Sequence, residues 1–253
     1  MLNEQEQKTI ETIVKKYYML PVLNKLDIKI AQIGCVVTLD SLHEIMTSAK
    51  QDVDNLLEKR KISGEIKDVA QARKSVVGQI FSNCILYLLL RSKEQGELRP
   101  DIYVTDKTLK NPLLEKFTVI RVDGETQKPD MDLVLYTLNK TTEVQDCLII
   151  SLKTSLRERA GQTYKWKLLL EIATTDSIIR EKYNISYECK KMPTVCFATV
   201  NFYNEINNPQ HRGMFKFFDN SFIGKPIEDS SFISRLSCLV DFANQRLEQG
   251  VIL

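Results

Sequence analysis

Hydrophobic residues recur at helical spacing through the first third of the chain. The pattern predicts helices over residues 4–19, 40–60 and 68–90. In the second of these, Ile45, Val53, Leu56 and Leu57 fall at helical intervals. Gly64 and the turn before it separate the second helix from the third. The first third is therefore expected to be helical.

After Gly96 the hydrophobic pattern changes to short runs that are typical of strands. The expected strands cover residues 117–122, 132–138, 146–152, 194–202 and 214–218. Turn-like clusters at 123–126 and 139–142 separate the first three, which predicts an antiparallel meander. Helical patterns follow at about 163–183 and 230–247. Together these elements predict a mixed α/β domain.

The chain has 253 residues, which suits one sizeable domain or a domain with an appended subdomain. No stretch approaches the roughly 20 apolar residues of a membrane span. The first residues, Met-Leu-Asn-Glu-Gln-Glu-Gln, lack a basic region followed by an apolar one. We therefore expect a soluble intracellular protein.

Six cysteines are scattered along the chain without a Cys-x-x-Cys pair, and there are only two histidines, His43 and His211. This composition disfavours both a zinc site and a disulfide framework. Cys84 and Cys147 lie inside apolar runs, where a free cysteine usually acts as a small core residue.

The charges nearly balance overall, since 35 basic residues face 33 acidic ones. Their distribution is uneven between residues 153 and 167. This segment contains one acid, Glu158, and five bases: Lys153, Arg157, Arg159, Lys165 and Lys167. Local positive charge of this kind suits phosphate contacts. The segment is therefore the first candidate for binding a polyanion.

Two residues at expected strand ends fit the chemistry of phosphodiester hydrolysis. That reaction needs a metal ion to offset the phosphate charge, an activated water and a nearby cation. If residues 132–138 and 146–152 form a hairpin, its open end brings Asp132 beside residues 151–153, because neighbouring strands lie about 4.8 Å apart. Ser151 and Lys153 then share one face of their strand, and Leu152 points to the other.

These residues carry a resemblance to a known nuclease superfamily. Pro129-Asp130, a hairpin and then a lysine resemble the PD-(D/E)XK signature, and Ser151-Leu152-Lys153 resembles the variant in which serine replaces the first acid. That variant occurs among type II restriction endonucleases. Lys153 followed by Arg157-Glu158-Arg159 resembles the group that reads CC and GG steps. The resemblance covers about residues 70–220 and is strongest over 130–160.

The resemblance implies an α/β fold with a PD-(D/E)XK core, in which helices flank a mixed central β-sheet. Residues 66–253 would form this catalytic domain. Residues 1–65 would form a helical N-terminal region for dimerisation or DNA contact.

The resemblance also implies a Mg²⁺ site in which Asp132 ligates the metal and Lys153 positions the attacking water. We favour Asp132 over Asp130, because Asp132 begins the strand proper. The acid lost at Ser151 would come from the following helix, at a position that is Lys167 here. The next carboxylate is Glu171, which we expect to share the metal.

Glu158 is the rival for this third acid, although Ser155-Leu156-Arg157-Glu158 is also a capping-box pattern. A continuous helix from Leu156 would carry Glu171 roughly 22 Å away at 1.5 Å per residue. The helix must therefore turn near Gly161 if Glu171 is to serve.

Target reading is expected from Arg157, Glu158 and Arg159. Arginine matches the N7 and O6 acceptors of guanine, and a carboxylate accepts from the cytosine amino group. The amide-rich loop 201–213 is a second candidate reader, although such segments are also ordinary turn chemistry. A palindromic double-stranded DNA target calls for a homodimer.

The full expectation is a type II restriction endonuclease in the bacterial or archaeal cytoplasm. A cognate DNA methyltransferase would belong to the same restriction-modification system. Two alternatives remain: a structure-specific repair or junction-resolving nuclease of the same fold, and a DNA-binding protein that has lost its chemistry.

Overall fold

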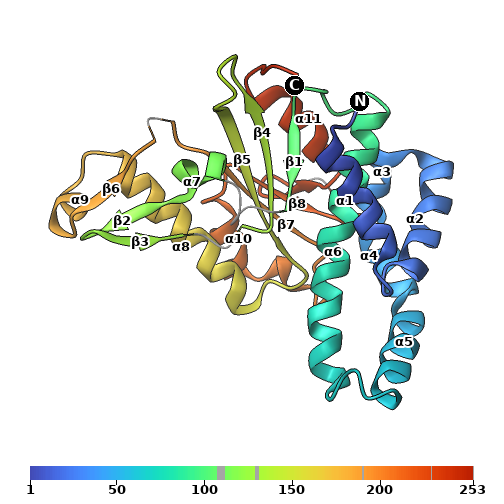
Figure 1. The fold of residues 1–253 in the computed structure, drawn as a ribbon. Helices are drawn as coiled ribbons and strands as arrows, with labels where there is room; N and C mark the ends of the chain where they lie inside the picture. Colours follow the sequence, from blue (N-terminus) through green and yellow to red (C-terminus); the bar gives the residue numbers. More distant parts are fainter. Residues whose placement is uncertain (107–111, 129–130, 190, 229, 253) are drawn as a thin grey trace.

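A mixed six-stranded sheet forms the centre of the protein (Figure 1). The computed structural model describes residues 1–106, 112–128, 131–189, 191–228 and 230–252, except for the side chains of residues 157–160 and 162. The sheet has the order β1-β4-β5-β7-β8-β9. The bounds of its strands are β1 Tyr103–Thr105, β4 Leu133–Leu138, β5 Val144–Lys153, β7 Thr194–Thr199, β8 Asn220–Ile223 and β9 Ser234–Arg235.

The strands run in two directions. β1, β4 and β5 pair antiparallel, whereas β5, β7, β8 and β9 pair parallel. As a result, β5 lies where the antiparallel part of the sheet meets the parallel part. Its last residue, Lys153, pairs with Thr199 of β7, which pairs in turn with Ile223 of β8. These three strands therefore end at the same edge of the sheet.

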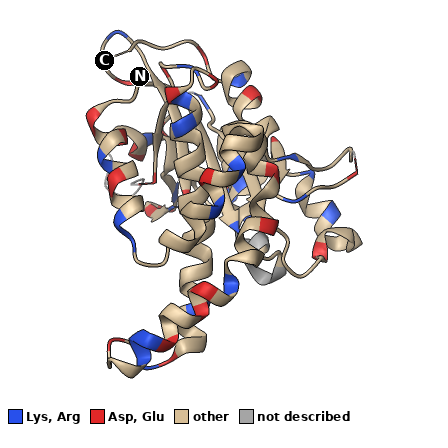
Figure 2. Cartoon of the chain, turned by 90° about the vertical axis from the view of Figure 1, so that its right-hand side faces the viewer, with Lys and Arg blue, Asp and Glu red and all other residues tan. Residues whose placement is uncertain are grey.

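The N-terminal helices cover one face of this sheet (Figure 1). Their buried residues share a core with Leu135, Leu148, Ile150 and Leu152 of the sheet. The bounds are α1 Glu4–Lys15, α2 Leu20–Ile33, α3 Cys35–Thr38, η1 Leu39–Ser41, α4 Leu42–Ser48, α5 Lys50–Ile62, α6 Val69–Glu94 and, from the C-terminal part, α11 Cys238–Arg246. The far ends of α5 and α6 project beyond the rest of the protein (Figures 1 and 2).

A second core covers the opposite face of the sheet. It contains Val134, Ile149 and Phe197 from the sheet, with Trp166 and Leu170 from α8. A small antiparallel sheet of order β3-β2-β6 lies beside α8. The bounds on this side are α7 Pro112–Thr118, β2 Ile120–Val122, β3 Glu125–Gln127, α8 Arg157–Thr174, α9 Ile178–Lys182, β6 Ile185–Tyr187, η3 Glu205–Asn207 and α10 Pro209–Phe215.

The structure confirms the expected α/β class and the hairpin at its centre. Strands β4 and β5 pair antiparallel, with Leu133 opposite Ile150. The first strand of the expected meander, 117–122, is only partly confirmed. Residues 117–118 end α7, and β2 at 120–122 joins the small sheet rather than pairing with β4. The expected helix 40–60 is divided into η1, α4 and α5, and the helix α2 was missed.

The strand expected at 214–218 is also wrong. Met214 and Phe215 end the helix α10, and the strand β8 begins only at Asn220. Phe215 and Phe218 are both buried against Phe197. Because short apolar runs fit either a strand or a helix, the local pattern alone did not distinguish them.

The helix α6 is long and apolar enough to cross a membrane by length and composition. Within the protein, 67% of its most apolar window is buried. It packs against α1, α3, α4 and α5 and against the sheet. These contacts are those of a core helix, which explains its composition without a membrane.

Candidate active site

Asp132 and Lys153 meet at the open end of the β4–β5 hairpin. The Lys153 Nζ lies 2.8 Å from Asp132 Oδ2, and the backbone N–H of Leu152 donates to the same oxygen at 2.8 Å. The side chains of Lys153 and Asp132 are 9% and 25% exposed. The site is thus partly enclosed, and the Asp132 carboxylate remains accessible.

The alternation of side chains along β5 separates the polar site from the N-terminal core. Ser151 and Lys153 face α8, where Ser151 Oγ lies 3.0 Å from Thr163 Oγ1. Leu152 lies in the opposite core with the N-terminal helices. The expected arrangement of these three residues is confirmed, because successive residues of a strand point to opposite faces.

Glu171 is not brought to Asp132 and Lys153. The helix α8 continues from Arg157 to Thr174, so the turn near Gly161 that Glu171 requires does not occur. The Glu171 carboxylate lies 3.4 Å from Lys167 Nζ, and Lys167 also contacts Asp219. This contact corrects the expectation that Glu171 joins the Asp132 site.

The position of Asp219 shows how far Glu171 lies from Lys153. Asp219 Oδ2 accepts the backbone N–H of Val195, which pairs with Ile149 of β5. Ile149 precedes Lys153 by about 13 Å at the usual rise of a strand. Glu171 therefore lies toward the other end of the sheet.

Lys167 is not available for the phosphate contacts that its place in the basic segment predicted. Its side chain is 2% exposed, and its Nζ lies 2.9 Å from Asp219 Oδ2. A buried ammonium group needs such a partner because desolvation is costly. Lys167 thus ties α8 to the start of β8 and serves the fold.

The backbone of Arg157, Glu158 and Arg159 forms the first turn of α8. Their side chains lie outside the described part of the structure, as does Asp130 as a whole. The first turn of α8 follows Lys153 after a three-residue connection, Thr154-Ser155-Leu156. The triplet is therefore close in the chain to the Asp132 and Lys153 pair.

Glu205 holds this connection and was missed in the sequence. Its Oε2 accepts the backbone N–H of Leu156, the residue that caps α8, at 2.7 Å. Asn201 Oδ1 accepts the Glu205 backbone N–H, and the Phe202 N–H donates to the Thr154 carbonyl. No sequence spacing links these residues, because they meet only when β7 lies beside β5.

Three amide side chains of the loop 201–213 are engaged in contacts within the protein. Asn208 Oδ1 accepts the Gln210 N–H at the start of α10, and Asn204 Oδ1 accepts from Lys225 Nζ. Asn201 caps the turn that carries Glu205. Asn201 and Asn208 therefore have ordinary turn and cap roles, whereas Asn204 binds the side chain of Lys225.

One described carboxylate at this sheet end is placed as a metal ligand would be. Magnesium binds through one or two carboxylates and retains several waters. Asp132 supplies one such group, at a partly exposed position beside a lysine. Among the residues that the structure describes, no group of three His, Cys, Asp or Glu side chains gathers as a metal site. The Asp132 carboxylate therefore suits a Mg²⁺ ion. The described residues contain no cluster of three such side chains that would complete the site.

A family model and a curated relative indicate a class of enzyme. Residues 107–242 match the family described as BsaWI restriction endonuclease type 2. A protein of Methanocaldococcus jannaschii described as "Putative type II restriction enzyme MjaVIP" is 26% identical over 176 residues, which span 62% of this chain and 76% of that protein. A solved complex of restriction endonuclease PspGI with substrate DNA aligns over 92% of this chain and 96% of its own, with 14% identity and a TM-score of 0.47.

The family match includes the Asp132 and Lys153 pair and covers more than half of the 253-residue chain. The protein therefore belongs to the BsaWI restriction endonuclease type 2 family and is a type II site-specific deoxyribonuclease.

Proposed function

We propose that the protein hydrolyses double-stranded DNA in a Mg²⁺-dependent reaction, at a palindromic sequence that contains CC/GG, with a core of the PD-(D/E)XK type. The observation that carries the active-site assignment is the contact of 2.8 Å between Lys153 Nζ and Asp132 Oδ2. A carboxylate and an ammonium group meet there at the end of a rigid antiparallel pair.

Asp132 would hold the metal. Its carboxylate is oriented by the Leu152 N–H and by Lys153, so it is preorganised before an ion binds. When bound, Mg²⁺ would offset charge on the phosphate and lower the pKa of a bound water. A fixed carboxylate loses little freedom on binding the ion, which favours a site at a strand start.

Lys153 would position the attacking water and stabilise the negative charge that develops on the phosphate. Its side chain is 9% exposed and lies on the side of β5 that faces α8, as Ser151 does. A cation in a partly desolvated site interacts more strongly with developing charge than one in bulk water. The neighbouring Asp132 carboxylate keeps this cation at the strand end.

For the third acid we propose Glu158 in place of Glu171. The backbone of Glu158 lies in the first turn of α8, and the contact of Glu171 with Lys167 lies toward the other end of the sheet. In that case Arg157 and Arg159 would read guanines. Glu158 would ligate the metal ion rather than accept a hydrogen bond from a cytosine amino group. Glu158→Ala would abolish cleavage, whereas Glu171→Ala would leave it near the wild-type rate. The reverse result would show that Glu171, and not Glu158, is the third acid of the metal site.

We propose further that the enzyme acts as a homodimer, because a palindrome presents the same sequence to two identical readers. The N-terminal helices, residues 1–65, are the proposed region of dimer or DNA contact. A cognate methyltransferase would protect the host sequence in the same restriction-modification system. The enzyme would act in the cytoplasm of a bacterium or archaeon, where incoming DNA is met.

Incubation with plasmid DNA and Mg²⁺ separates this proposal from its rivals. Discrete fragments with a CC/GG sequence at their ends support it. Cutting only at branched or damaged DNA would indicate a repair or junction-resolving nuclease instead. Retention of DNA without cutting would indicate an inactive binding protein.

Two variants test the active site. Asp132→Ala and Lys153→Ala should each lower the cleavage rate by at least about 10³-fold, as expected for groups that act on the reacting phosphate. Both should retain measurable DNA binding. Lys140→Ala is the matched control, because Lys140 is an exposed lysine in the β4–β5 turn at the opposite end of the hairpin. Normal cutting by either test variant would refute the assignment.

A further inference from the structure

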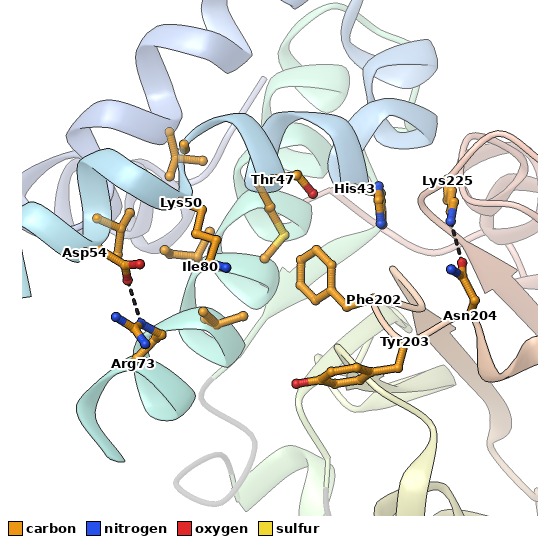
Figure 3. Close-up of a pocket in the computed structure, with 15 residues that line it drawn as sticks. His43, Thr47, Lys50, Asp54, Arg73, Ile80, Phe202, Tyr203, Asn204 and Lys225 are labelled. Carbon is orange, nitrogen blue, oxygen red and sulfur yellow. Dashed lines mark hydrogen bonds and ion pairs between the residues drawn. The ribbon is translucent and has the colours of Figure 1, made fainter. Parts of the chain in front are cut away.

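A cavity of about 520 Å³ lies between the N-terminal helices and the loops that follow β7 and β8 (Figure 3). Its apolar part comes mainly from α2, α5 and α6, through Val22, Val53, Val77 and Ile80. Phe202 and His43 form one wall, with ring centroids 5.3 Å apart. Figure 3 shows Tyr203 beside them, and this residue is 61% exposed.

Basic side chains surround this cavity on more than one element. Lys50 begins α5, Arg73 lies in α6 and Lys225 follows β8. One acid, Asp54, lies among the lining residues and pairs with Arg73 at 2.6 Å. Burial lowers the pKa of His43, and the neighbouring Lys225 lowers it further. Both effects disfavour a positive charge on the His43 ring, and Lys50 and Lys225 supply the net positive charge.

The cavity is connected to the active-site end of the sheet by hydrogen bonds. The Phe202 N–H donates to the carbonyl of Thr154, which follows Lys153, at 3.2 Å. Lys225 Nζ donates to Asn204 Oδ1, and the His43 N–H donates to the Gly224 carbonyl at the end of β8. The cavity thus lies at the same end of the sheet as Lys153, toward the N-terminal helices.

We propose that this cavity receives a sugar-phosphate unit of the DNA strand beside the cleavage site, with Lys50 and Lys225 contacting its phosphates. This inference rests on the proposed DNA cleavage at Asp132 and Lys153. The two lysines supply charge for phosphate oxygens, and Phe202 supplies an apolar surface for the deoxyribose.

Such a contact positions DNA without reading its sequence. Phosphate contacts fix the register of a protein on the duplex and carry no base information. Lys50 and Lys225 should therefore raise affinity for every duplex, cognate or not. Their effect should also depend strongly on salt, since each neutralised phosphate releases counterions.

The test is the salt dependence of duplex binding by fluorescence anisotropy, without divalent metal so that no cutting occurs. We expect the double variant Lys50→Ala/Lys225→Ala to reduce the slope of log K against log salt by about 2, since each phosphate contact contributes about 0.9. The loss should be the same for cognate and unrelated duplexes. Lys140→Ala is the matched control and should leave the slope unchanged.

Lys50→Arg/Lys225→Arg keeps both charges and should retain the wild-type slope, which separates lost charge from disturbed folding. An unchanged slope in the alanine variant would overturn the proposal, as would a loss confined to the cognate duplex. Failure of the proposed cleavage function would appear differently, as intact plasmid with the wild-type protein and Mg²⁺.

Discussion

Ser151 Oγ and Thr163 Oγ1 lie 3.0 Å apart in a buried hydrogen bond that joins the strand carrying Lys153 to the helix α8. Both side chains are nearly inaccessible, at 1% and 6% exposure for the whole residues. The serine that replaces an acid in the family resemblance thus has a structural partner. The Ser151–Thr163 contact fixes α8, and with it the backbone of Arg157–Arg159, against β5.

Thr163→Val should destabilise the protein by about 1–2 kcal/mol, because the substitution keeps the shape and leaves the Ser151 hydroxyl without its partner. Ser151→Ala should have a similar cost. The double variant should cost less than the sum, since two apolar groups then face each other. Urea unfolding of the four proteins measures this coupling, and strictly additive costs would show that the bond is unimportant.

The family resemblance implies an acid at position 167, where this sequence has a lysine. Substituting Lys167 tests whether an acid there would contribute to cleavage. Lys167→Glu would place a new carboxylate beside Asp219 and Glu171, whose oxygens lie 2.9 and 3.4 Å from the present ammonium group. We expect destabilisation without any gain in cleavage. Higher activity in this variant would mean that α8 shifts to bring its residues to the metal.

Lys167→Met is the companion variant, because it removes the charge and keeps the volume. It should cost about 2–4 kcal/mol, somewhat less than a fully buried broken pair, since Asp219 is 28% exposed. Lys165→Met on the exposed side of α8 is the matched control and should change urea unfolding little.

Glu205 should act by positioning the segment between Lys153 and α8. Glu205→Gln keeps an oxygen that can accept the Leu156 N–H, whereas Glu205→Ala removes it. We expect the alanine variant to cut DNA about tenfold more slowly, equivalent to one lost hydrogen bond of about 1.4 kcal/mol, and the glutamine variant to stay near wild type. If both variants are equally inactive, the carboxylate itself takes part in the chemistry.

Acid should weaken the protein through Asp101. Burial raises the pKa of this carboxyl, but two hydrogen bonds from Arg99 and one from the Gly250 N–H lower it more, so the net pKa falls. A folded pKa below the unfolded value contributes stability above about pH 4 that is lost as pH falls further. Asp101→Asn should therefore show a smaller loss of unfolding free energy between pH 6 and pH 3.

Asp52→Asn is the control for this comparison, because Asp52 is exposed on α5 and should leave the pH dependence unchanged. An identical pH profile for wild type and Asp101→Asn would show that the contacts of Asp101 do not distinguish its protonation states.

The sequence by itself determined the α/β class and the hairpin that brings Asp132 to Lys153. Both depend on local signals, since two apolar runs separated by a turn cluster at 139–142 predict an antiparallel hairpin, in which successive side chains alternate between the two faces. The same alternation predicted that Ser151 and Lys153 face away from Leu152.

Only the tertiary structure decided which residues from distant parts of the chain contact one another. Lys167 meets Asp219, and Glu205 meets Leu156, because β7 and β8 lie parallel to β5 after long crossovers. A crossover leaves no fixed spacing between the residues that it joins. The sequence therefore predicted a basic phosphate ligand at Lys167, whereas packing buries that charge as a structural ion pair.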